Sequence, residues 1–156
     1  MLASANSTYT DVMTSVFSST IAGKAWLASA AGLLAVIQVS TGARIFGKLQ
    51  GVIPLRQPWV GRIHRWSGRL AVFFTLPVAF HCIFLLGFQT TSARVLAHSI
   101  VGSLLYGIVA VKLFFVHDPL HPRWVLPVVG GTLFAAIATL WGTGSLWYFT
   151  EVRFGF

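Results

Sequence analysis

Charged residues are scarce in this sequence, and acidic residues are nearly absent. Only 9% of its 156 residues are Asp, Glu, Lys or Arg, against about 25% in a typical soluble domain. Three residues in total are acidic, which leaves little scope for hydrolytic chemistry with paired carboxylates or for proton pumping. The one cysteine, Cys82, excludes a disulfide framework or an iron–sulfur cluster held by this chain alone.

Apolar residues take the place of the missing charges and make up 56% of the chain. They form four runs, each near the roughly 20 residues that a helix needs to cross a bilayer. After a polar segment over 1–24, the runs cover 26–45, 63–88, 95–117 and 124–149. We therefore predict an all-α integral membrane protein, with one transmembrane domain of four helices over residues 1–156.

The connections between the four runs are short, and prolines interrupt two of them. Residues 46–61 read as an interfacial loop or short surface helix, 89–92 as a turn, and 117–122 as a break that its prolines impose. Short connections make successive helices antiparallel neighbours, as in an up-down bundle.

Basic residues are distributed unevenly over the two sides of this bundle. Most of them flank the loops 46–61 and 117–122, whereas the opposite side carries only Lys24, Arg94 and Arg153. The positive-inside rule then makes the loop side cytoplasmic, with both termini external, in a cell (cytoplasmic) membrane. This distribution explains the net charge of +8 without nucleic acid as a partner.

The second and third runs each carry one histidine near either end. Intramembrane histidines are costly and mark functional sites. Because the two runs are antiparallel and joined by a short turn, His81 and His98 are expected to meet at one membrane face. Two facing imidazoles are what a six-coordinate b-type haem requires. Hydrogen-bonded structural histidines, or a proton-relay histidine, are the alternative interpretation.

His64 and His117 form the corresponding pair at the opposite face, and they predict a second haem. His117 closes its helix, and His121 lies close enough in sequence to replace it as the ligand. Both histidines of this pair are nearer to water, where an ordinary surface histidine is the competing interpretation.

Small and basic residues beside these histidines fit the same hypothesis. Gly68 and Gly102 each follow a histidine by one helical turn, on the same face, where a flat porphyrin needs close approach. Ordinary packing of membrane helices also favours glycine there. Arg65 and Arg69 are predicted partners for the haem propionates, because arginine binds carboxylates bidentately.

Taken together, these motifs resemble small b-type membrane cytochromes of the b-561-like and ferric-reductase-like kind. The resemblance is carried by His64-Arg-Trp-Ser-Gly-Arg-Leu70, Phe80-His81 and Ala97-His98-Ser-Ile-Val-Gly102. The C-terminal half, from Leu126-Pro-Val-Val-Gly-Gly131 to Ser145-Leu-Trp-Tyr-Phe149, is also similar to four-span membrane proteins of unassigned function. The family resemblance implies electron transfer across a bilayer, with quinol, ascorbate or a flavin domain as donor.

We therefore expect a transmembrane electron-transfer subunit that binds one or two haems b, rather than a stand-alone enzyme. Its expected partners are other membrane or periplasmic redox subunits, such as a cytochrome c, and quinone or quinol. The alternative is a haem-free structural or quinone-binding subunit of the same kind of complex. The expected ligands of iron are His81, His98, His64 and His117.

Overall fold

The computed structural model describes residues 2–52, 54, 56–118 and 120–153, and every regular element in these ranges is a helix. Four stretches are long and apolar enough to cross a membrane: Thr20–Ile45, Gln57–Leu86, Ala93–His117 and Val125–Val152. The prediction of an all-α, multi-pass membrane protein is confirmed. Parts of the two predicted loops, at 53, 55 and 119, and the chain ends at 1 and 154–156 lie outside the described residues.

Each spanning stretch is built from the following helices. The first is α2 (Thr20–Ile45), and the second is α3 (Gln57–Phe80) followed by the π-helical segment η1 (His81–Leu86). The third is α4 (Ala93–His117). The fourth is α5 (Val125–Trp141), which continues as η2 (Gly142–Leu146) and η3 (Tyr148–Arg153).

Serine caps begin two of the spans at the same end of the molecule. The side-chain oxygen of Ser19 accepts a hydrogen bond of 3.1 Å from the Ala22 N–H, and that of Ser92 accepts one of 3.3 Å from the Val95 N–H. Each cap satisfies a backbone donor that the first helical turn leaves unpaired.

A proline changes the winding of the second span before it ends. Pro77 lies inside α3 and lacks an N–H, so one bond of the helical ladder is missing there. At the end of α3, the N–H of His81 bonds to the carbonyls of both Pro77 and Val78. The chain then continues as η1, whose π-helical turns are wider than those of an α-helix. Gly87, with φ of +67°, ends the segment in a backbone conformation that favours glycine.

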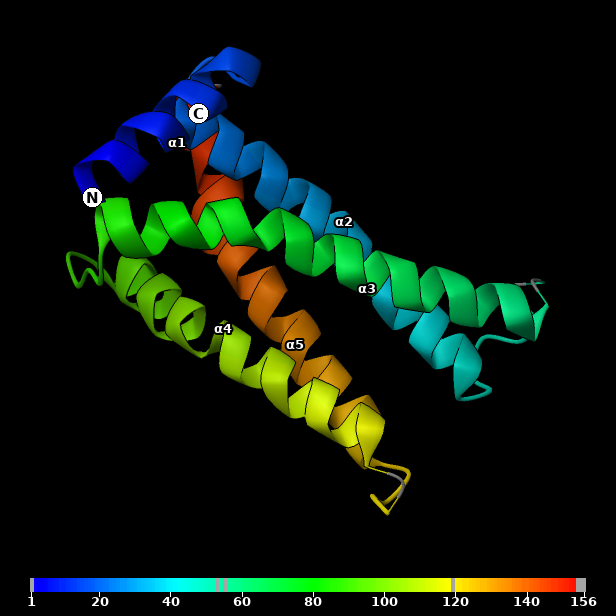
Figure 1. The fold of residues 1–156 in the computed structure, drawn as a ribbon. Coiled ribbons are helices and arrows are strands. Elements are labelled where there is room, and N and C mark those ends of the chain that lie inside the picture. The colour runs from blue at the N-terminus through cyan, green and yellow to red at the C-terminus, as the bar shows by residue number, and fades with distance from the viewer. Residues whose placement is uncertain (1, 53, 55, 119, 154–156) are drawn as a thin grey trace.

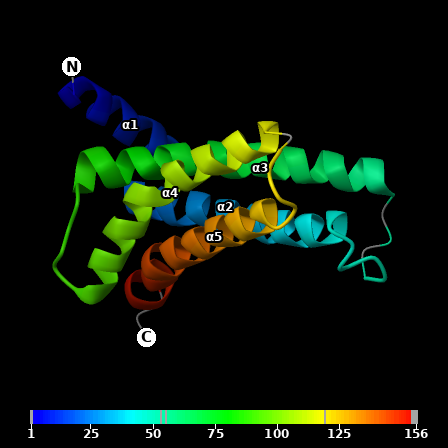
Figure 2. The same cartoon turned by 90° about the horizontal axis from the view of Figure 1, so that it is seen from below.

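The chain turns at alternate ends, so successive spans are antiparallel (Figure 1). We call the end with α1, the last turn of η3 and the turn 87–92 the terminal end, and the end with residues 46–52 and 120–124 the loop end. The expected pairing of α3 with α4 is replaced by another order. Tight backbone packing joins α3 to α2, α2 to α5, and α5 to α4. Figure 2 shows α4 crossing α3 at an angle, whereas it runs beside α5.

The predicted polar N-terminal segment contains a fifth helix, α1 (Leu2–Val16), at the terminal end. It packs on α2 where the absence of a side chain at Gly23 admits Met13 and Phe17. Met13 is buried in this contact. The ring of Tyr9 lies 5.0 Å from that of Phe80, measured between centroids, so α1 also covers the end of α3.

Candidate functional site

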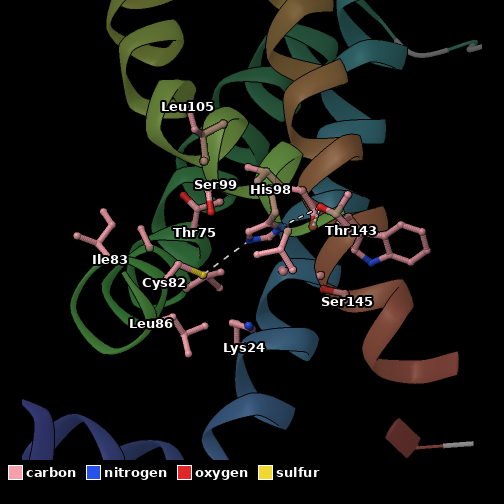
Figure 3. Close-up of a pocket in the computed structure, with 18 of the residues that line it drawn as sticks. Lys24, Thr75, Cys82, Ile83, Leu86, His98, Ser99, Leu105, Thr143 and Ser145 are labelled. Carbon is pink, nitrogen blue, oxygen red and sulfur yellow. Dashed lines mark hydrogen bonds between the residues drawn. The ribbon is translucent and has the colours of Figure 1, made fainter. Parts of the chain in front are cut away.

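A cavity of about 390 Å³ opens between α3 and α4 at the terminal end (Figure 3). Its size falls within the range of cofactor pockets, which is about 300–1,000 Å³. All four spans contribute to its wall, which is mainly apolar, and Lys24, Arg94 and His98 are its basic residues. No acidic side chain lines it among the described residues.

His98 presents one ring nitrogen to this cavity, and the neighbouring helix fixes the other. Its Nδ1 lies 2.8 Å from Thr143 Oγ1. The Thr143 hydroxyl donates its own proton to the carbonyl of Thr139, at 2.6 Å. Thr143 therefore accepts from the Nδ1–H of His98, and the lone pair remains on Nε2. A histidine held in this way is prepared to bind a metal through Nε2.

One sulfur atom and one glycine lie close to the His98 ring. The thiol Sγ of Cys82 lies 3.9 Å from Nε2 (Figure 3). A side chain at Gly144 would place its Cβ 3.1 Å from His98 Cε1, so a larger residue there would press on the ring. Gly102 lines the cavity one turn further along α4, where the sequence predicted it beside His98.

His81 lies at the same end but does not line this cavity. Its side chain is 3% exposed and packs against Tyr9, with 5.8 Å between the ring centroids. Within the described part of the chain, neither of its ring nitrogens has a hydrogen-bond partner. Cys82, the next residue, takes the position facing His98. The structure thus brings His81 and His98 to one end of the molecule without turning the two rings toward each other.

The helix α1, which covers His81, also has buried polar atoms without hydrogen-bond partners among the described residues. The buried Tyr9 hydroxyl and the Asn6 Oδ1 atom both lack a hydrogen bond. Burial raises the pKa of Tyr9 to about 12, because loss of water disfavours the charged phenolate.

The contribution of Tyr9 to docking of α1 should depend on pH in the alkaline range. Since the folded-state pKa of Tyr9 is raised above its ordinary value of 10.0, this contribution is complete below that value and is lost as pH rises through about 12. The difference in phenolate absorbance between the wild type and Tyr9→Phe isolates the ionisation of Tyr9 and should have its midpoint near pH 12. A midpoint near pH 10 would contradict the prediction.

At the loop end, His64 belongs to a polar network that joins three spans. Its Nδ1 lies 2.9 Å from Thr41 Oγ1 on α2. Gln38 Nε2 donates to the His64 carbonyl and to Ser67 Oγ, the latter at 2.8 Å. Lys112 on α4 donates to Gln38 Oε1 at 3.2 Å. Gly68 makes room for Gln38 rather than for a cofactor, since a Cβ there would lie 3.1 Å from its Nε2.

The other residues predicted for the loop end are exposed or contact nearby residues in their own part of the chain. His117 is exposed, and its Nδ1 lies 2.8 Å from the Leu113 carbonyl of its own helix. His121 packs on Phe115, with 6.1 Å between the ring centroids. Arg65 and Arg69 are exposed, and the Arg69 guanidinium lies 5.2 Å from the centre of the Trp66 ring. The structure therefore does not gather these side chains around His64.

Sequence reasoning overlooked three residues that shape the two regions. Thr143 and Thr41 each anchor a histidine of a neighbouring span, and Gln38 is the centre of the loop-end network. The available signal was the polar character of Gln38 and Lys112 inside apolar runs, because such residues require partners in a membrane.

Comparison with known proteins gives one match. A family of unknown function, DUF6529, matches residues 3–156. The chain belongs to this family. No curated protein and no solved structure matches it. The function of this DUF6529 protein therefore has to be argued from its own residues.

Proposed function

We propose that this DUF6529 protein is a haem-binding membrane subunit that transfers electrons. One observation carries the proposal: His81 is 3% exposed, and neither of its ring nitrogens has a hydrogen-bond partner among the residues that the structure describes. Burial of an unpaired polar group costs free energy, and native proteins satisfy nearly all such groups. A metal bound at a ring nitrogen would satisfy His81. His98, with its lone pair on Nε2 at the cavity, supports the proposal independently.

The scarcity of further ligands favours haem over a bare metal ion. Within the described residues, no three His, Cys, Asp or Glu side chains gather where they could hold a metal. Structural zinc takes four protein ligands and catalytic zinc takes three. Haem brings four nitrogens of its own, so one or two imidazoles are enough to bind its iron. The apolar wall of the cavity also suits a porphyrin.

In this proposal, His98 binds the iron from the cavity wall, and His81, which lies outside that wall against Tyr9, would have to turn its ring away from α1 to become the second ligand. Bound haem supplies reversible one-electron chemistry. Thr143 fixes the tautomer and orientation of His98, and the apolar wall excludes water, two factors that tune a redox potential. The proposal covers one haem at the terminal end. The second haem predicted from the sequence is not part of this proposal, because His64 contacts Thr41 on α2 and His117 contacts the Leu113 carbonyl of its own helix.

The surroundings of such a subunit follow from the distribution of its charges. The basic loop end would face the cytoplasm, and the terminal end would face a periplasmic or external redox partner such as a cytochrome c. Quinone or quinol in the cytoplasmic membrane is a further candidate for exchange of electrons. The chain would then serve in a larger redox complex.

The absorption spectrum of the purified full chain tests the haem proposal. After expression with a haem supply, we expect a reduced-minus-oxidised α-band of low-spin haem b, with one haem per chain by pyridine haemochrome. His117→Ala is the matched control and should retain the band, because its ring is exposed and bonded to its own helix. Absence of the band, both as purified and after addition of haemin to the apoprotein, would refute the proposal.

A further inference from the structure

The cavity contains two cations and no acidic side chain among its described residues. Lys24 lies in the second turn of α2, and Arg94 lies in the first turn of α4, so both lie near the terminal end. The three acidic residues of the chain, Asp11, Asp118 and Glu151, do not line the cavity. Cations in an apolar, partly buried site are costly unless an anion accompanies them.

Arg94 is held in place with most of its donors unused. Its Nη1 donates to the Thr143 carbonyl at 2.5 Å, and its guanidinium lies 4.3 Å from the centre of the Trp147 ring. Arginine has five N–H donors in a rigid fork, and this contact uses one. Because the Arg94 side chain is already held in one position, binding a carboxylate costs it less conformational entropy.

Lys24 is the second cation of the wall. Figure 3 shows it between Leu86 and Ser145. Lys24 lines the same cavity as Cys82 and His98. Arg94 also contacts Thr143, the residue that anchors His98, which links this arginine to the same candidate ligand.

We infer that the cavity selects a ligand with an apolar body and carboxylates directed to the terminal end, and that Lys24 and Arg94 bind these carboxylates. The inference rests on the proposed function, in which the carboxylates are the two haem propionates. It moves the propionate partners from Arg65 and Arg69, which the sequence favoured, to the opposite end of the molecule.

Haem and its dimethyl ester distinguish the contribution of the propionates from that of the iron. The ester keeps the porphyrin and the iron but has no anionic carboxylates. Loss of one charge-assisted hydrogen bond weakens binding by about 10- to 100-fold, so the wild-type apoprotein, which would lose the bonds of two cations, should bind the ester at least roughly 10-fold more weakly than haem. The paired variant Lys24→Gln/Arg94→Gln should bind both forms with similar affinity, close to that of the wild type for the ester.

Retained binding of the ester shows that the paired variant still folds, which makes the comparison internally controlled. Lys48→Gln/Arg62→Gln is the matched control: Lys48 is exposed, and Arg62 lies over Trp59 at 4.7 Å, as Arg94 lies over Trp147. This control variant should prefer haem over the ester to the same extent as the wild type. Equal binding of haem and ester by the wild type would overturn this inference and leave the haem proposal standing. The inference would also be overturned if Arg65→Gln/Arg69→Gln bound haem and ester equally while Lys24→Gln/Arg94→Gln still preferred haem. If the wild-type protein bound neither haem nor the ester, the proposed function itself would be refuted.

Discussion

Replacement of His98 by alanine is expected to abolish haem binding. His98 is the one histidine in the described wall of the cavity, and its Nε2 carries the lone pair that faces the interior. Loss of a residue that merely orients a metal ligand reduces affinity by about 10- to 100-fold, so loss of the ligand itself should reduce it by more than about 100-fold. The α-band and the pyridine haemochrome of the purified variant measure this loss.

His81→Ala should give the same loss, because His81 is the buried imidazole without a partner. Thr143→Val should give an intermediate loss, since it removes the bond to His98 Nδ1 but keeps the ligand. His121→Ala is the control for a histidine outside the cavity and should bind haem as the wild type does. A His98→Ala protein with unchanged haem content would refute the assignment of this ligand.

The hydrophobic pattern was sufficient to predict the four spans, and connection lengths were sufficient to predict their alternating direction. Both depend on local properties: about 20 apolar residues in a row, and prolines that stop a helix. The sequence also predicted that His98 and Gly102 would share a face, since they are one turn apart on α4, which the structure forms as a continuous α-helix.

Rotation about the helix axis could not be predicted in the same way. His81 and His98 were expected to face each other because their depths match, but depth does not fix the direction of a side chain. Pro77 and the π-helical turn after it alter the winding between residues 77 and 86. As a result, Cys82 faces His98, and His81 faces α1. The polar composition of residues 1–24 gave no indication that α1 would be a helix.

The same limit explains the loop end. The sequence paired His64 with His117 by depth on the assumption that α3 and α4 pack together. In the structure, α3 packs on α2, so His64 meets Thr41. Thr41 donates to the Ile37 carbonyl at 2.6 Å, as Thr143 does to that of Thr139. At each end of the molecule, a threonine that donates to the carbonyl one turn earlier in its own helix thus anchors a histidine of a neighbouring span. Local periodicity does not reveal such a relation, because the two residues belong to different spans.

Gln38→Leu is expected to destabilise the protein strongly, although Gln38 touches no proposed ligand of iron. Gln38 Oε1 is the acceptor for Lys112, and its Nε2 donates to Ser67 Oγ and to the His64 carbonyl. Leucine at this position would leave the Lys112 ammonium within a membrane span without this acceptor. Leaving a buried polar group without its partner costs about 1–3 kcal/mol, and more for a charged group. We expect a loss of about 2–3 kcal/mol in the free energy of unfolding, measured by reversible denaturation in mixed micelles.

Substitution of Lys112 determines whether its unpaired charge causes the instability of Gln38→Leu. Lys112→Leu alone should have a small effect, because Gln38 keeps its bonds to α3 and the charge is gone. Gln38→Leu/Lys112→Leu should then recover most of the lost stability, since breaking a buried polar pair is costly whereas replacing both partners by apolar groups is often neutral. Gln50→Leu, in the exposed loop, is the control for the substitution itself. If the double variant is as unstable as Gln38→Leu, the bonds from Gln38 to α3, and not the charge of Lys112, hold this end of the protein together.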